Sequence, residues 1–344
     1  MVDIQKLIRP NVRNLKPYSS ARDEFKGSAS VWLDANENPN NNGLNRYPDP
    51  LQKKLKARIS ELKNVPAENI FLGNGSDEAI DLLFRGFCEP GKDKALICTP
   101  TYGMYQVSAD INDVEVIDVP LTSDWQLCVE GIQKHFADPN LKLIFICSPN
   151  NPTGNSMKKE DVLALISAFN GLVVIDEAYI DFSESKSLSS ELQESNNLII
   201  LQTLSKAWGL AGIRLGMAFA NEQVIEVLNR IKPPYNVNQL TQEVALKELA
   251  NEAGFKNEVE AILTERMRLT KELTQLKNVL YIYPSDANFL LVKFTEPRTV
   301  YNALTDKGIV VRDRSKVAKG CLRITVGTEA ENSQLINELK KLQS

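Results

Sequence analysis

Histidine is almost absent from this chain of 344 residues, and its scarcity excludes whole classes of chemistry. The single histidine, His135, lies in a polar stretch, residues 131–135, that is typical of a protein surface. A catalytic triad needs a histidine beside its nucleophile, and many metal sites are rich in histidine. We therefore expect neither a histidine-based triad nor a histidine-rich metal site, and no bound metal.

Paired cysteines are also missing. The five cysteines are widely spaced, odd in number and without a CxxC pair. Cys98 and Cys147 lie in apolar runs and are typical of small core residues. The pattern favours free thiols in a reducing compartment.

Long apolar runs and basic clusters are absent as well. No run approaches the roughly 20 residues that cross a membrane, and the first ten residues lack the apolar core of a signal peptide. The formal net charge is -4 and the basic residues are scattered. We therefore expect a cytoplasmic protein that binds neither membrane nor nucleic acid.

What the sequence does contain is ordinary globular composition, 43% hydrophobic and 24% charged, enough for two domains. Its middle part alternates short apolar runs with amphipathic patterns. Continuous apolar runs separated by helices predict an α/β fold with a mostly parallel sheet covered on both faces. The predicted strands are 70–72, 95–98, 143–147, 173–175 and 198–201, and the predicted helices include 77–87 and 162–169.

A second pattern follows Pro233-Pro234. Long helical patterns cover residues 240–276, and a smaller α+β domain is predicted after them. Its predicted elements are strands 289–294, 309–312 and 321–326 and helices 299–306 and 331–342. The segment 36–50, rich in asparagine and proline, is predicted to be an ordered loop or arm. The predicted division is 1–45 as an N-terminal arm or small-domain part, 46–234 as the large domain and 235–344 as the small domain.

Lys206 stands in an unusual place for a lysine. It lies between small residues just past the apolar run 198–201, where an amine is poorly solvated. Such an amine is suited to form a Schiff base with a carbonyl group. Most lysines are solvated surface groups, so this segment alone does not decide its role.

Polar groups follow several of the predicted strands. Ligands of open parallel sheets bind beyond the carboxyl ends of the strands, so these groups are expected at one rim. Together they match the needs of pyridoxal phosphate (PLP), which are a lysine, a carboxylate for the ring nitrogen, donors for the phenolate, a stacking ring and an anion cradle. The segments are 73–77, 99–102, Asn150-Asn151, Asp176 with Tyr179, and Ser205-Lys206.

Each segment also has a simpler interpretation. The 73–75 turn is not a dinucleotide fingerprint, because Glu78 occupies its third glycine position. It opens a helix whose N–H groups suit a phosphate, although Asp77 and Glu78 could satisfy that helix end instead. Residues 151–154 could be a plain turn, Asp176 a helix cap and Tyr102 an ordinary buried aromatic residue.

Longer motifs extend over nearly the whole chain. They are Val12-Arg13-Asn14-Leu15, Pro17-Tyr18, Asn45-Arg46-Tyr47-Pro48, residues 100–105, 148–154, 176–179, 203–207, 210–214 and 320–327. With them the chain resembles the fold-type I PLP-dependent aminotransferases, and most closely the histidinol-phosphate aminotransferases. The connection from Arg312 to Arg323 is shorter than in that family's pattern.

The resemblance implies a role for each matched residue. Lys206 would hold PLP and then act as the base at the substrate's Cα. Asp176 would keep the ring nitrogen protonated, Asn151 and Tyr179 would bind the 3′ oxygen, and Tyr102 would stack on the ring. The phosphate would be surrounded by Gly75, Ser76, Asp77, Ser205 and Arg214, mainly through backbone N–H groups at 75–77.

The resemblance also implies partners. Tyr47 would reach the phosphate from a second subunit, which implies a homodimer. Arg323, with Tyr18 and Arg312, would bind the anionic end of histidinol phosphate or of 2-oxoglutarate and glutamate. The implied activity is a transamination in histidine biosynthesis. The alternatives are an aromatic amino acid aminotransferase, a PLP-dependent phosphothreonine decarboxylase and a PLP-binding regulator, which lacks support because no basic helix pair precedes the core.

Overall fold

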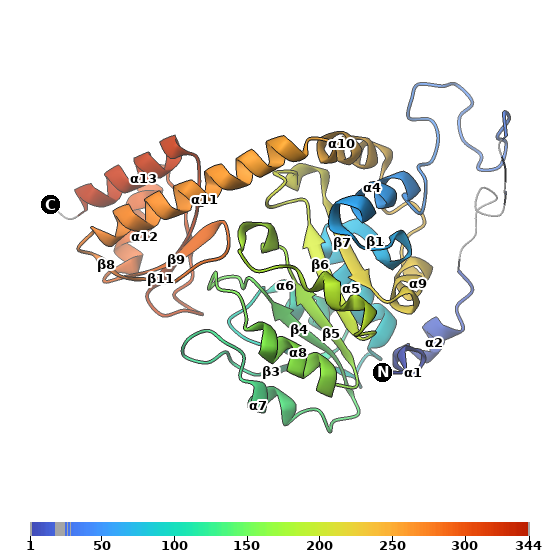
Figure 1. Cartoon of the computed structure of the whole chain (residues 1–344), viewed down its shortest axis with the longest axis horizontal. Helices are drawn as coiled ribbons and strands as arrows, with labels where there is room; N and C mark the ends of the chain where they lie inside the picture. The colour runs from blue at the N-terminus through green and yellow to red at the C-terminus, as the bar shows by residue number, and fades with distance from the viewer. Residues whose placement is uncertain (1, 18–24, 26, 28, 343–344) are drawn as a thin grey trace.

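The structure, a computed structural model, describes the chain except for residues 1, 18–24, 26, 28 and 343–344. Tyr18, expected at the substrate, lies outside the described residues. Two sheets organise the molecule, one of seven strands and one of four (Figure 1). The predicted fold class, a large mostly parallel sheet between helices with a smaller α+β part, is confirmed.

The large sheet has the strand order β1-β7-β6-β5-β4-β2-β3. Strands β2 to β6 pair in parallel, whereas β7 runs antiparallel to both of its neighbours. The strands are β1 (Ile70–Asn74), β2 (Lys94–Ile97), β3 (Glu115–Asp118), β4 (Leu141–Cys147), β5 (Leu172–Asp176), β6 (Leu198–Thr203) and β7 (Leu215–Ala220). All five strands predicted for this region are present, and β3 and β7 were not predicted.

Alternate residues of each central strand face two different helical layers. In β5, Val173 and Ile175 pack with one core and Leu172 and Val174 with the other, as the two-residue period of a strand requires. One layer contains α1 (Ile4–Leu7), α2 (Pro10–Arg13), α5 (Ser76–Phe87), α6 (Met104–Ile111) and α9 (Glu222–Ile231). The other contains α4 (Lys53–Lys63), α7 (Val129–Gln133), α8 (Lys159–Ala168) and α10 (Gln239–Leu249). Short 3₁₀ turns are η1 (Ala67–Asn69), η2 (Ile180–Phe182), η3 (Leu188–Gln193) and η4 (Ala211–Ile213).

The small sheet is wholly antiparallel, in the order β10-β11-β9-β8. Its elements are α11 (Glu252–Thr274), β8 (Val279–Ile282), β9 (Phe289–Phe294), α12 (Pro297–Asp306), β10 (Arg312–Asp313), β11 (Cys321–Thr325) and α13 (Glu329–Lys341). The strand predicted at 309–312 is wrong in extent. Strand β10 comprises only Arg312 and Asp313, and the preceding Val310 is 80% exposed.

Helix α11 connects the two parts of the molecule. Near its start, Phe255 stacks on Trp208, with ring centroids 4.0 Å apart, while Leu269 and Leu273 belong to the core of the small sheet. Ala245 and Leu249 of α10 still belong to the core of the large sheet. We therefore propose that the boundary between the two domains lies within α11. The division at residues 45 and 234 stays a prediction.

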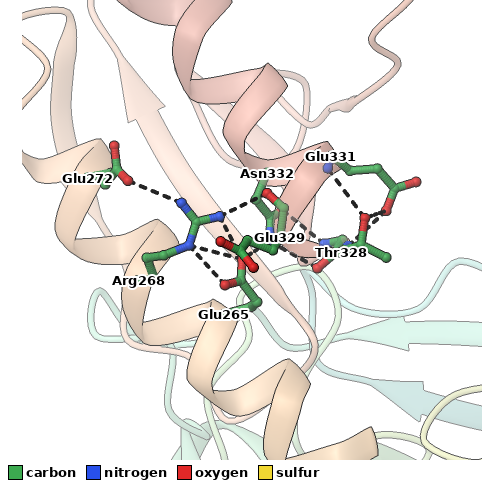
Figure 2. Close-up of polar contacts among 8 residues, drawn as sticks. Glu265, Arg268, Glu272, Thr328, Glu329, Glu331 and Asn332 are labelled. Atoms are coloured by element: carbon green, nitrogen blue, oxygen red, sulfur yellow. Dashed lines mark hydrogen bonds and ion pairs between the residues drawn. The ribbon is translucent and has the colours of Figure 1, made fainter.

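One arginine ties α11 to the start of α13 (Figure 2). Arg268 donates to Glu265 and Glu272 on its own helix and to the backbone oxygen of Glu329. Asn332 of α13 also donates to Glu265, at 2.8 Å. Single exposed ion pairs contribute only about 0–1 kcal/mol, but here several charges share one network with the buried Asn332, which holds the two helices together.

Two features are absent from the part of the chain that the structure describes. None of the helices there is long and apolar enough to cross a membrane. Nor do three or more His, Cys, Asp or Glu side chains gather there in a way that could hold a metal ion.

Candidate active site

A cavity of about 570 Å³ opens at the carboxyl ends of the large-sheet strands and is closed on one side by the small sheet. Twelve of the predicted site residues line it. They are Gly75, Ser76, Asp77, Tyr102, Asn151, Asp176, Tyr179, Ser205, Lys206, Arg214, Arg312 and Arg323. The rule that ligands of parallel sheets bind at this edge therefore located the cavity.

The strand directions explain this convergence. Strands β1, β4, β5 and β6 end at this rim, whereas β7 runs the other way and begins there, which places Arg214 beside the turn after β1. The Gly75 N–H donates to the Arg214 carbonyl at 2.9 Å. Gly216 permits this approach, because a Cβ there would collide with the backbone nitrogen of Ser76.

The turn at Gly75 is shaped to hold an anion. Gly75 has φ +74°, and a Cβ at this position would meet Arg214 Nη2 at 2.7 Å. No side chain caps the start of α5, so its first N–H groups and its dipole face the cavity. The alternative that Glu78 itself satisfies the start of this helix does not hold. Its carboxylate instead accepts from the Asn74 N–H, which lies before the helix.

Asp77 has a different role from an anion ligand. Its carboxylate accepts from the Tyr102 hydroxyl at 3.0 Å and lies 3.5 Å from Arg214 Nη2. It therefore orients Tyr102, which is half-buried on the cavity wall, and Arg214. This agrees with the expectation that only the backbone of Asp77 would meet a phosphate.

Asp176 is a deeply buried carboxyl group of the cavity, at 3% exposed. Burial raises the pKa of its carboxyl group, and hydrogen bonds from Tyr105 and Ala178 oppose that rise. The Ala178 N–H donates to Oδ1 of Asp176 at 3.0 Å. The alternative interpretation of Asp176 as a helix cap therefore accounts for only one of its two carboxylate oxygens. The other oxygen, Oδ2, accepts from the Tyr105 hydroxyl at 2.6 Å.

Tyr105 was not predicted to serve the site. It is fully buried, stacks on Phe145 with centroids 4.9 Å apart, and meets the ring of Tyr102 edge-on at 5.5 Å. Its only sequence signal is its position three residues after Tyr102, which puts both rings on one side of the start of α6.

Lys206 follows β6 and points into the cavity. The residue as a whole is exposed toward the open cavity, whereas its amine is partly surrounded by cavity residues, as expected for a poorly solvated amine. Partial burial, and then the charge of Arg323, lower the pKa of its amine. Its Nζ lies 5.5 Å from the centre of the Tyr179 ring.

Arg323 connects the small sheet to the large one. Its Nη1 donates to Asn151 Oδ1, and its guanidinium lies 5.3 Å from the centre of the Phe289 ring. The same ring meets Tyr179 edge-on at 5.2 Å. Burial lowers the pKa of Arg323, and burial raises that of Tyr179, so the phenol stays neutral.

Tyr47 is not brought into the cavity of its own chain. It is 51% exposed and stacks on Tyr235, with centroids 4.4 Å apart. The segment that carries it stands away from the sheet at the right of Figure 1. Tyr47 therefore does not reach this cavity within one chain.

The cavity residues fit PLP. A glycine turn under an arginine suits its phosphate, a buried carboxylate its ring nitrogen, and a neutral phenol with an amide its 3′ oxygen. The lysine amine has a lowered pKa and shares that cavity.

Comparison with known proteins decides the family. The profile described as "Aminotransferase class I and II" matches residues 19–339. The chain belongs to the class I and II aminotransferases. This family is PLP-dependent, so PLP is the cofactor.

Among curated members of this aminotransferase family, the histidinol-phosphate aminotransferase of Parabacteroides distasonis is 58% identical over 99% of both chains. Among solved structures, the histidinol-phosphate aminotransferase from Clostridium acetobutylicum has a TM-score of 0.81 at 25% identity, covering 87% of this chain and 91% of that one. The enzyme from Sinorhizobium meliloti, in complex with pyridoxal-5′-phosphate, has a TM-score of 0.77 at 23% identity and covers 86% and 83%.

Proposed function

We propose that this aminotransferase converts histidinol phosphate and 2-oxoglutarate to imidazole-acetol phosphate and glutamate, a step of histidine biosynthesis. The relative at 58% identity supports this substrate, since its name denotes the activity. The observation that carries the proposal is the cavity itself. A lysine and a buried carboxylate occupy one side, and arginines from β10 and β11 occupy the side where a substrate's anionic end would lie.

PLP, when bound, supplies an electron-accepting ring. The chain supplies the proton transfer. The amine of Lys206, with its pKa lowered, would take the proton from the substrate's Cα and deliver it to the cofactor's C4′, because a neutral amine is the form that acts as a base. Asp176 would keep the ring nitrogen protonated, and Tyr105 holds Asp176 in place.

The neighbouring polar groups position the reactants. Asn151 and Tyr179 would donate to the 3′ oxygen, and Tyr102 would cover the ring face. Ser205, Arg214 and the backbone at residues 75–77 would bind the cofactor phosphate. Arg323, with Arg312, binds the phosphate of histidinol phosphate in one half-reaction and a carboxylate in the other, since a guanidinium fork suits both anions.

The active unit is a cytoplasmic homodimer in this proposal. Large apolar side chains are exposed on the N-terminal segment and on α10, including Val31 (70%), Leu33 (89%), Leu44 (56%) and Leu240 (56%). Such a concentration is typical of an interaction surface. Tyr47 lies on this segment, so a second copy bound there would receive it at its cofactor phosphate.

A side-by-side turnover assay tests the proposed substrate. Histidinol phosphate, phenylalanine and phosphothreonine are compared, each with 2-oxoglutarate, and glutamate formation and carbon dioxide release are both measured. We expect histidinol phosphate to have the highest kcat/KM. A higher value for phenylalanine would make the chain an aromatic aminotransferase, and carbon dioxide from phosphothreonine would make it a decarboxylase.

A further inference from the structure

A third arginine, Arg314, lines the cavity beside the two predicted ones. Arg312 pairs with Arg323 across β10 and β11, so their side chains lie on the same face of the sheet. The ladder continues for one more hydrogen bond, from the Arg314 N–H to the Cys321 carbonyl at 3.0 Å. Because strand side chains alternate with period two, Arg314 lies on the face of Arg312 and Arg323, diagonal to the latter.

The opposite face of the same strands is committed to other contacts. Leu322 lies in the core of the small sheet. Asp313, the acid nearest in sequence, accepts from the Ser315 N–H and lies 3.7 Å from Arg298. Neither residue shares the face of Arg314, so the local acid does not neutralise it.

The three arginines have no acidic partner among the residues that the structure describes. Nε of Arg314 and Nε of Arg323 are buried there without a hydrogen-bond acceptor. Burial, and then the charges of Arg323 and Arg312, lower the pKa of Arg314. Tyr179, the nearby phenol, is neutral and cannot serve as the counter-ion.

Three like charges on one cavity wall, with unused donors, are suited to an anion of more than one charge. We propose that Arg314 is a specificity-determining residue that makes this wall favour a dianionic phosphate monoester over a carboxylate. The inference rests on the proposed function, since it concerns how that site separates its two substrates. A phosphate monoester carries a charge of about -1.5 to -2 near neutral pH, and glutamate presents a side-chain charge of -1.

The predicted effect of removing Arg314 follows from charge. Coulomb energy scales with the charge of the ligand, so a loss of about threefold for a carboxylate becomes a loss of about tenfold for a dianion. In the holoenzyme of Arg314→Gln we therefore expect KM for histidinol phosphate to rise about tenfold and KM for glutamate to rise about threefold or less. Arg314→Lys keeps the charge and is expected to keep most of the discrimination.

The matched control is Lys316→Gln. It removes the same charge from the same loop, but Lys316 is exposed and does not line the cavity. It is expected to leave both KM values unchanged. Cofactor absorbance and the melting temperature are measured for every variant, and Arg314→Lys maintains the test if Arg314→Gln does not fold.

A second measurement separates this inference from the proposed function. Inorganic phosphate and acetate are compared as competitive inhibitors of the glutamate half-reaction, which requires no histidinol phosphate. We expect Arg314→Gln to weaken phosphate inhibition more than acetate inhibition. An equal change for both anions, or the same change in Lys316→Gln, would overturn the role of Arg314. A wild-type enzyme that does not turn over histidinol phosphate would overturn the proposed function, and the inhibitor ratio would still decide the role of Arg314.

Discussion

The hydrogen bond from Tyr105 to Asp176 is the contact whose removal is most informative. Tyr105→Phe deletes one oxygen and keeps the ring that stacks on Phe145 and meets Tyr102. The lost bond is 2.6 Å long and lies in the buried floor of the cavity. No other group among the described residues donates to Asp176 Oδ2, so the substitution leaves that oxygen unpaired until cofactor binds.

A hydrogen bond to a charged group contributes about 1.5–3 kcal/mol, so its loss raises the pKa of the buried Asp176 carboxyl group further. An Asp176 that keeps its own proton is neutral and no longer stabilises a proton on the ring nitrogen, which slows proton removal at Cα. We therefore expect kcat to fall about 10- to 100-fold, with little change in KM for either substrate.

The assay is a pH profile of kcat in saturating PLP. Burial raises the pKa of Asp176 and Tyr105 opposes that rise, so the acidic limb of the profile should move to higher pH in the variant. Tyr301→Phe, which changes a tyrosine of α12 outside the cavity, is the control. A kcat within about twofold of wild type with an unmoved acidic limb would refute the positioning role of Tyr105.

The stability of the apoprotein gives a second readout. A carboxyl group with a raised pKa binds its proton more tightly when folded than when unfolded. The contribution of this carboxyl group to the free energy of unfolding is therefore lost as pH rises from its ordinary pKa of 3.8 through its raised pKa in the folded protein. Tyr105→Phe should enlarge this loss, so the difference in melting temperature from wild type should be larger at pH 8 than at pH 5.

Three further outcomes are expected. Arg214→Gln should raise the dissociation constant of PLP about 10- to 100-fold in a cofactor titration, since it removes a charged donor beside the turn at Gly75. An unchanged dissociation constant would mean that the cofactor phosphate binds elsewhere. Mixing inactive Tyr47→Phe and Lys206→Ala chains should restore activity if each site takes its tyrosine from the other copy, and no recovery in a proven mixed dimer would contradict that arrangement. The native protein is alkylated briefly at pH 8 and the modified cysteines are identified by peptide mapping. Cys128 should react first, because the other four thiols are buried and burial raises their pKa values. Rapid modification of a buried thiol would indicate local opening.

The parts of the fold with strong periodicity were predictable. The apolar runs that form β1, β2, β4, β5 and β6 predicted the large sheet. The polar groups that follow these runs predicted the position of the cavity. Strand β7 was not predicted, because Leu-Gly-Met-Ala-Phe-Ala is rich in small residues that have low strand preference. Only tertiary pairing with β1 and β6 makes it a strand.

The supporting residues of the site were harder to find. In the sequence, Tyr105 cannot be told from any other core aromatic residue. Its partner Asp176 is 71 positions away, and only the fold brings the two side chains together. Arg314 could be recognised only from the register of β10 against β11, because the period of two puts it on the side of Arg323. Tyr47 was identified by resemblance alone, and the fold of one chain does not bring it to the cavity.

Helix α11 has a consequence for the range of substrates. It supplies no side chain to the cavity wall, yet it runs from Phe255, stacked on Trp208 two residues after Lys206, to the core beneath β11. At a rise of 1.5 Å per residue, its length is about 35 Å, so a tilt of about 5° at its first turn displaces its far end by about 3 Å. The span between the Lys206 amine and the Arg323 guanidinium, and with it the length of amine that the enzyme accepts, is therefore set partly by a helix that no substrate touches.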